Sequence, residues 1–272
     1  MAASLKKADI YKDMTMRHTK DTKKVLVENT AVEATALAAE IFKTTICEAV
    51  DARGECALAL AGGTTPHALY QQLAETAASG EVPWESVEVY FGDERDVPHD
   101  NVESNYLMIQ RNLLDHVPVQ PGKVHPMPAD AEDLATAADQ YEKMIRANVV
   151  SGTDGLPQFD LVLLGMGGDG HTASLFAGTD AVDQTDKLVK ACFVPVLGRS
   201  RMTLTFPLIN AARNVLLLVT GADKAEAVAK LLSEDPAARQ DLPAGHIDPK
   251  GNFIVVLDAP AARVTRPRTE LD

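Results

Sequence analysis

One short segment carries the side chains best suited to acid–base chemistry. Residues 159–178, FDLVLLGMGGDGHTASLFAG, begin as an apolar run and continue with four glycines in six positions, and Asp169 and His171 lie within that glycine-rich turn. Imidazole titrates near neutral pH, so His171 is a candidate general base. Glycine lets a ligand approach the main chain closely, and the candidates for such contacts are Gly167, Gly168 and Gly170.

Two other interpretations of this turn compete with a catalytic one. The string at 165–170 matches G-x-G-x-x-G, but lysines and aliphatic residues occupy 187–190, where a dinucleotide fold needs an acid. The second alternative has no ligand: Asp169 caps a helix expected to begin at His171 and to include Phe176. An Asp and a His two residues apart favour a site over a cap.

Three further polar clusters follow apolar runs of strand length. Gly62, Gly63, Thr64 and Thr65 precede Pro66, which suits the first position of a helix. Their N–H and hydroxyl groups can bind phosphate, although a tight capping turn is the alternative. Asp93-Glu94-Arg95 and Gly221–Lys224 are the other two clusters. The carboxyl ends of parallel strands share one sheet edge, so the clusters predict one cavity.

Apolar periodicity predicts the elements that position these clusters. The expected strands are 24–28, 56–61, 87–91, 159–164, 188–196, 202–206, 215–220 and 253–257, with Arg199 and Arg201 between two of them. The expected helices are 30–52, 67–78, 104–116 with Ser104 as its N-cap, 129–149 and 224–232, and 118–128 is expected to be a loop. This order predicts an α/β fold with a Rossmann-like, mainly parallel sheet and helices on both faces.

Composition limits the partners of this chain. It has 272 residues and a formal net charge of −13, which argues against non-specific nucleic-acid binding and requires a local basic pocket for an anionic substrate. No apolar stretch approaches the roughly 20 residues of a membrane span. Three scattered cysteines, Cys47, Cys56 and Cys192, fit a reducing compartment and no zinc cluster.

The ends of the chain differ from its centre. Residues 1–24 hold seven Lys or Arg and no apolar signal sequence, which predicts a basic, disordered extension. Residues 25–264 are expected to form a single α/β domain, and 265–272 a polar tail. The four clusters in that domain predict a hydrolase or isomerase acting on a small, phosphorylated, oxygen-rich molecule.

Five motifs identify a family. They are AGGTTP at 61–66, FGDERDVPHDNVESNY at 91–106, GMGGDGHTASLF at 165–176, RMTLTFPLIN at 201–210 and TGADK at 220–224. Together they resemble the lactonase branch of the glucosamine-6-phosphate isomerase/6-phosphogluconolactonase family, over nearly all of 25–260. The deaminase branch shares a D-G-H core, but Thr-Ala-Ser-Leu-Phe follows His171 here, and Arg95 stands where deaminases have Tyr.

The resemblance implies cytoplasmic hydrolysis of 6-phospho-D-glucono-1,5-lactone to 6-phospho-D-gluconate in the oxidative pentose phosphate pathway, with no metal or organic cofactor. It implies that His171 activates water and that Asp93 or Asp169 orients the imidazole. The implied substrate and phosphate contacts are Gly62, Gly63, Thr64, Thr65, Arg95, Asn105, Gly167, Gly168, Gly170, Arg201 and Lys224, with Arg199 as an alternative to Arg201. We expect a monomer or a weak homo-oligomer.

Three rival functions remain open at this stage. In a glucosamine-6-phosphate deaminase or sugar-phosphate isomerase, Asp93 would move a carbon-bound proton. A non-catalytic sugar-phosphate sensor would need a DNA-binding module, and residues 1–24 are too few for one. An esterase with Ser174 as nucleophile lacks the G-x-S-x-G elbow.

Overall fold

The computed structural model describes residues 23–263. Its main sheet has seven parallel strands in the order β1-β10-β9-β6-β2-β3-β5. The strands are β1 (Lys23–Glu28), β2 (Cys56–Leu60), β3 (Val87–Phe91), β5 (Val124–His125), β6 (Leu161–Leu164), β9 (Asn214–Val219) and β10 (Asn252–Asp258). The predicted parallel α/β architecture is confirmed.

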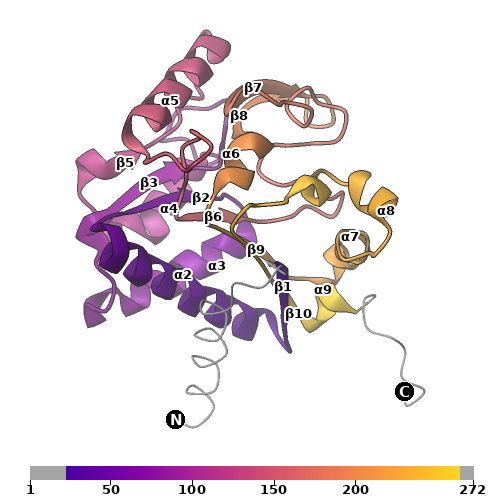
Figure 1. Cartoon of the computed structure of the whole chain (residues 1–272), viewed down its shortest axis with the longest axis horizontal. Helices are drawn as coiled ribbons and strands as arrows, with labels where there is room; N and C mark the ends of the chain where they lie inside the picture. Colours follow the sequence, from indigo (N-terminus) through magenta and orange to yellow (C-terminus); the bar gives the residue numbers. More distant parts are fainter. Residues whose placement is uncertain (1–22, 264–272) are drawn as a thin grey trace.

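Helices cover both faces of this sheet (Figure 1). On one face lie α2 (Ala31–Arg53) and α3 (Thr64–Thr76), and on the other lie α5 (Leu134–Asn148) and α6 (Phe206–Ala211). From β2 the chain continues to β3 and β5 on one side of the sheet, and from β6 it continues to β9 and β10 on the other side. Because crossovers between parallel strands are right-handed, the helices that connect these two groups of strands lie on opposite faces. That reversal leaves a crevice at the carboxyl ends of β2 and β6, where open α/β sheets bind ligands.

The central strand β6 is buried on both sides. All four of its residues, Leu161–Leu164, are inaccessible to solvent, as its unbroken apolar run predicts. Asp160 precedes it and pairs with Arg53 at 2.7 Å and Arg213 at 3.1 Å. The Asp160 carboxylate also accepts a hydrogen bond from the Ala57 N–H at 2.9 Å. The acid thus fixes the amino end of β6, opposite the crevice.

A second, antiparallel sheet was not predicted. It has the order β4-β8-β7, formed by β4 (Asp93–Arg95), β8 (Arg199–Leu204) and β7 (Val189–Val194). Arg199 and Arg201 therefore lie within a strand, and their expected placement between strands is wrong. The reason is tertiary: the charged β4 is too short to be recognised alone and forms by pairing with β8.

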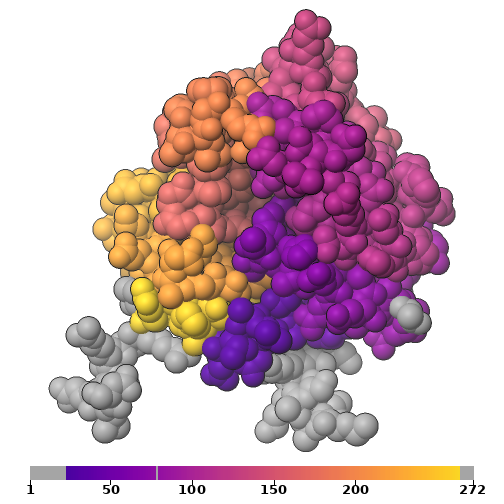
Figure 2. All heavy atoms as spheres, turned by 180° about the vertical axis from the view of Figure 1, so that it is seen from behind, coloured from indigo at the N-terminus to yellow at the C-terminus, as the bar shows by residue number. Residues whose placement is uncertain are grey.

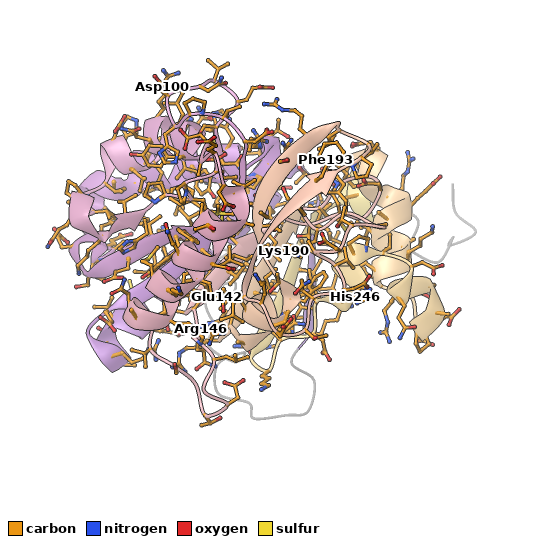
Figure 3. The ribbon with its side chains drawn as sticks, turned by 90° about the horizontal axis from the view of Figure 1, so that it is seen from above. Asp100, Glu142, Arg146, Lys190, Phe193 and His246 are labelled. Atoms are coloured by element: carbon orange, nitrogen blue, oxygen red, sulfur yellow. The ribbon has the colours of Figure 1, made fainter. Side chains whose placement is uncertain are left out.

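Helix α5 anchors this second sheet. The Glu142 carboxylate accepts hydrogen bonds from the N–H groups of Leu188 at 2.7 Å and Val189 at 3.3 Å, and pairs with Arg146 at 2.8 Å. Figure 3 shows Glu142 and Arg146 on α5, beside the strand that bears Lys190 and Phe193. The sheet is thereby held against the main domain.

The segment after the glycine turn is not a helix, so the helix expected from His171 is wrong. Ala173 has φ of 47°, in the left-handed region, and Thr172 and Leu175 form an isolated antiparallel bridge. The Thr172 hydroxyl donates to the Gly165 carbonyl at 2.8 Å, and Ser174 is buried. Long-range contacts of these hydroxyls override local helix propensity.

Other boundaries differ from expectation by a few residues. Helix α3 begins at Thr64, so Pro66 is its third residue, and Ser104 caps α4 (Asn105–Asn112) as predicted. Helix α5 begins at Leu134 after its cap Asp133, five residues later than expected. The expected loop 118–128 contains the short edge strand β5. Helices that were not predicted are the 3-10 helices, α6 and α8 (Pro236–Gln240); α7 (Ala225–Leu231) and α9 (Ala259–Ala262) complete the fold.

The predicted chain ends lie mostly outside the described residues. Of the basic extension expected at 1–24, Lys23 and Lys24 belong to β1, and residues 1–22 are outside. The predicted tail 265–272 is outside as well. Among residues 23–263, no helix is both long and apolar enough to cross a membrane.

Candidate active site

The strand ends surround one cavity of about 590 Å³. Figure 2 shows the face of the molecule that is hollowed between the salmon and orange segments on one side and the purple segments on the other. The predicted residues that line the cavity are Gly62, Gly63, Thr64, Thr65, Asp93, Arg95, Asn105, Gly167, Gly168, Asp169, His171, Arg201 and Lys224. The parallel sheet thus brings together residues spread over more than half of the chain.

Gly170 is the predicted site residue that does not line the cavity. Its φ is 82°, and its N–H donates to the Gly167 carbonyl at 3.0 Å. A Cβ atom added there would lie 2.2 Å from a methyl carbon of Leu242. Only glycine therefore fits this position of the turn, and a substrate contact at Gly170 stays a prediction.

Asp169 is the carboxylate that contacts His171. The imidazole Nδ1 lies 2.6 Å from Asp169 Oδ1, and the His171 backbone N–H donates to the same oxygen at 3.2 Å. An ionised carboxylate only accepts hydrogen bonds, so Nδ1 carries a proton, and in the neutral ring Nε2 keeps its lone pair. Within residues 23–263, no protein atom forms a hydrogen bond with this Nε2.

The ring of His171 is held by packing as well. It stacks on Phe176 with centroids 4.0 Å apart and planes inclined by 19°. Gly167 makes room for this arrangement, because a Cβ there would lie 2.2 Å from His171 Nδ1. Burial acts to raise the pKa of Asp169, but the hydrogen bond and charge of His171 outweigh it and lower that pKa. The Asp169 carboxylate is therefore charged at neutral pH.

Asp93 has different partners. Its carboxylate accepts hydrogen bonds from the Ser174 hydroxyl at 2.6 Å and from the Asn105 amide at 3.2 Å. The Asn105 side chain packs so closely on Gly62 that a Cβ at Gly62 would lie 1.8 Å from its oxygen. Asp93 and Asn105 therefore form a fixed polar wall of the cavity, and Ser174 is bound to a carboxylate instead of a histidine.

Buried Glu94 explains why Asn105 reaches the cavity. Its side chain is fully inaccessible and accepts hydrogen bonds from the N–H groups of Asn105 and Tyr106, both at 2.8 Å, and from the Ser104 hydroxyl at 3.0 Å. These donors belong to the first turn of α4, which otherwise lacks acceptors. The acid thus joins β4 to α4, a role that sequence reasoning missed.

The amino end of α3 faces the cavity without a protein cap. Its N-cap is Gly63, no side chain among residues 23–263 accepts from its first N–H groups, and its first turn contains no acid. Thr65 Oγ1 lies 3.1 Å from Thr220 Oγ1. Free N–H groups at a helix amino end favour an anion, so this turn can bind phosphate.

Three cations line the same cavity. Arg95 and Arg201 are direct partners across the β4·β8 ladder, and Lys224 lies 2.9 Å from Asp223. Burial, followed by the charge of Arg95, lowers the pKa of Arg201. Arg199 does not line the cavity and pairs with Asp96 at 3.2 Å and Glu103 at 2.8 Å. The geometry favours Arg201 over Arg199 as an anion ligand.

The described residues offer little for metal or cysteine chemistry. In residues 23–263 there is no group of three or more His, Cys, Asp or Glu side chains placed to hold a metal ion. Burial, with smaller contributions from Asp180 and Asp93, raises the pKa of Cys192 to about 11. A thiol of that pKa is a poor nucleophile at neutral pH.

Nine cavity residues were not predicted as site residues: Ala61, Pro66, Gly165, Met166, Ala173, Ser174, Phe176, Val196 and Leu197. Val196 and Leu197 come from the turn between β7 and β8. Phe176 lies inside the quoted motif GMGGDGHTASLF, five residues after His171, and that spacing could have indicated it. Val196 and Leu197 carry no sequence signal, because aliphatic side chains near a turn are ordinary.

Comparisons with known proteins agree with this geometry. A family model described as glucosamine-6-phosphate isomerases/6-phosphogluconolactonase matches residues 29–256. A 6-phosphogluconolactonase of Synechocystis sp. is 39% identical over 245 residues, 90% of this chain and 96% of that protein. A crystal structure of 6-phosphogluconolactonase from Leishmania guyanensis has a TM-score of 0.80 at 29% identity, covering 90% of this chain and 99% of that one. A monomeric glucosamine-6-phosphate deaminase has a TM-score of 0.74 at 25% identity, covering 89% and 99%.

Proposed function

This chain belongs to the glucosamine-6-phosphate isomerase/6-phosphogluconolactonase family, and we propose that it hydrolyses 6-phospho-D-glucono-1,5-lactone to 6-phospho-D-gluconate. One observation carries the proposal. The Asp169–His171 pair leaves Nε2 without a protein partner, in a cavity that also holds three cations and an uncapped helix end. A base beside an anion site is what a phosphorylated lactone requires.

The first step is attack by water. His171 Nε2 takes a proton from a water molecule, and the oxygen adds to the lactone carbonyl carbon C1. Asp169 holds the ring in the tautomer with Nδ1–H and stabilises the imidazolium that forms. Phe176 restricts rotation of the ring by stacking on it. The carbonyl π electrons move to oxygen, which becomes an oxyanion.

The oxyanion needs a hydrogen-bond donor. In the glycine turn, the N–H of Gly167 donates to the His171 carbonyl at 2.9 Å, and that of Gly170 donates to Gly167. Neither is available to the substrate. The Gly168 N–H has no acceptor among the described residues, so we propose it as the donor to the oxyanion.

Collapse of the tetrahedral intermediate completes the reaction. The C1–ring oxygen bond breaks, and protonated His171 returns its proton to the departing ring oxygen. Arg95, Arg201, Lys224 and the amino end of α3 bind the phosphate and so orient C1 toward His171. Asp93 of β4 and Asn105 of α4 supply polar contacts from another wall of the same cavity.

The rival functions lack a matching observation. A deaminase would use Asp93 to move a carbon-bound proton, but here that carboxylate is shared between Ser174 and Asn105. A Ser174 esterase would need the hydroxyl to donate to His171, and it donates to Asp93. An initial-rate assay of lactone hydrolysis, corrected for spontaneous opening and run beside glucosamine-6-phosphate deamination, separates these functions. Deamination without lactonase activity would refute the proposal.

We also propose a cytoplasmic enzyme that is a monomer or a weak homo-oligomer. Support comes from the net charge of −13, which disfavours tight self-association, and from three cysteines that are all free. Fractionation of the source cells and sedimentation of the purified protein test the two parts separately.

A further inference from the structure

We propose that Asp96 is a positioning residue for phosphate, because its carboxylate fixes the strand that presents Arg201 beside Arg95. This inference rests on the proposed function, in which these two arginines bind the substrate phosphate. Asp96 does not line the cavity, so it acts through the residues that do.

The arrangement of the two arginines creates the need for such a residue. Arg95 and Arg201 are directly opposite each other in the antiparallel β4·β8 pair, and both line the cavity. Like charges at directly opposed positions destabilise a strand pair. The Arg201 side chain is only 11% exposed, so water screens this repulsion weakly. An ordered anion near the pair is therefore required when the cavity holds no phosphate.

Asp96 is placed to meet that need. It directly follows β4, and its carboxylate contacts three consecutive residues of β8. It accepts hydrogen bonds from the Ser200 backbone N–H at 3.2 Å and from Arg199 Nε at 3.2 Å, and it lies 3.7 Å from Arg201 Nη1. Because Asp96 directly follows Arg95, its side chain links the end of β4 to the segment of β8 that contains Arg201.

The same loop also holds Arg95. The Arg95 guanidinium donates to the backbone carbonyl of Glu103, whose side chain pairs with Arg199 at 2.8 Å. The loop between β4 and α4 therefore fixes both arginines, one through Asp96 and one through a main-chain carbonyl. Arg199 is the shared partner of Asp96 and Glu103, which accounts for its absence from the cavity lining.

Two opposite results are conceivable when the Asp96 charge is removed. If Asp96 acted only as a negative charge near the cavity, its loss would strengthen phosphate binding. If it positions β8, its loss weakens phosphate binding. The second outcome follows from the contacts, because the two hydrogen bonds run to Ser200 and Arg199 while the Arg201 contact is the longest of the three.

The test measures binding of inorganic phosphate by calorimetry and lactonase kinetics on the full chain. We expect Asp96→Asn to weaken phosphate binding and to raise KM for the phosphorylated lactone about three- to tenfold, the usual effect of losing charge-assisted hydrogen bonds. The value of kcat should change less. Hydrolysis of unphosphorylated glucono-1,5-lactone should be unaffected, since it lacks the group that the arginines bind.

Two matched controls separate position from charge. Glu103→Gln removes an equal charge from the same ion-pair group without touching Ser200 or Arg201, and should change phosphate affinity less than Asp96→Asn does. Asp96→Glu keeps the charge but displaces the carboxylate, and should also weaken binding. Asp100, which Figure 3 shows at the outer edge of this loop, supplies the exposed variant Asp100→Asn, expected to match the wild type.

Several results would overturn the inference. They are unchanged or tighter phosphate binding in Asp96→Asn, equal effects of Asp96→Asn and Glu103→Gln, wild-type affinity in Asp96→Glu, or a wild-type protein that binds no phosphate. If Asp96→Asn does not fold, Asp96→Glu decides the question. A wild type whose phosphate binding is weakened by Asp96→Asn as expected, but which hydrolyses no lactone, would refute the proposed function and leave this inference standing.

Discussion

A single contact, 2.6 Å between His171 Nδ1 and Asp169 Oδ1, shows which of the two acids lies against the histidine. The sequence left Asp93 and Asp169 as equal candidates for that contact. Asp93 does not make this contact, and its carboxylate instead accepts a hydrogen bond from the hydroxyl of Ser174, 81 positions away in the chain. No local pattern reveals a pairing at that separation.

Asp169→Asn should lower kcat by roughly tenfold or more and change KM little. The amide can no longer stabilise the imidazolium, and the general base supplies a large share of the rate. Initial rates across a range of lactone concentrations measure both constants. Asp93→Asn is the informative comparison, because a larger kcat loss there than in Asp169→Asn would reverse the assignment of the two acids.

The same pair predicts a pH dependence of stability. The pKa of Asp169 is lowered in the folded protein, so its contact with His171 stabilises the fold above the ordinary Asp pKa of about 3.9. That stabilisation is lost as pH falls through the lowered value. The melting-temperature difference between wild type and Asp169→Asn should therefore be larger near pH 5 than in more acidic buffer, where it shrinks. A difference that grows on acidification would contradict the contact.

At the scale of elements, most strands and helices of the main sheet follow from local patterns, with β5 and α6 as exceptions. In the second sheet, β7 and β8 overlap expected strands, but β4 and the antiparallel pairing do not follow from local patterns. Apolar runs such as Leu161–Leu164 are read correctly as buried strands because burial on both faces imposes that composition. Strand β4 is Asp-Glu-Arg, a composition typical of a loop, and it exists because β8 pairs with it. Arg199 and Arg201 were misplaced for the same reason.

The glycine turn gives a prediction with an internal control. Gly170 and Gly178 have similar φ values, 82° and 78°, but only at Gly170 would a Cβ meet a neighbour, Leu242 at 2.2 Å. Gly178→Ala should cost about 1 kcal/mol from backbone strain alone. Gly170→Ala should cost about 1–3 kcal/mol more, because Leu242 must move. Chemical denaturation measures both, and equal costs would show that Leu242 does not restrict the turn.

At the scale of the whole molecule, an acidic protein must attract an anionic substrate. The net charge is −13, yet the cavity gathers Arg95, Arg201 and Lys224 around the uncapped end of α3. The sequence predicted this local concentration because parallel strands place their carboxyl ends at one edge. It could not predict that Arg95 contacts the Glu103 carbonyl and Arg201 contacts Asp96, since both partners come from the loop between β4 and α4.

Removal of these cations should act mainly on binding. Arg201→Ala and Lys224→Ala should raise KM for the phosphorylated lactone more than they lower kcat, because the phosphate is remote from the bond that breaks. The KM of the wild type should also rise with ionic strength, and that dependence should weaken in both variants. Lys143→Ala, at an exposed position of α5, is a control for general charge effects. Unchanged KM in both folded cavity variants would remove the phosphate assignment.

The central claim is that His171 is the general base of a lactonase, and the direct measurement is the lactone hydrolysis rate of His171→Ala. The assay subtracts spontaneous opening, and circular dichroism with thermal melting shows whether the variant is folded. We predict a stable protein whose kcat falls by roughly 10²–10⁴-fold with a smaller change in KM. A folded His171→Ala protein that keeps more than about half of the wild-type kcat would contradict the claim, since losing a general base costs far more.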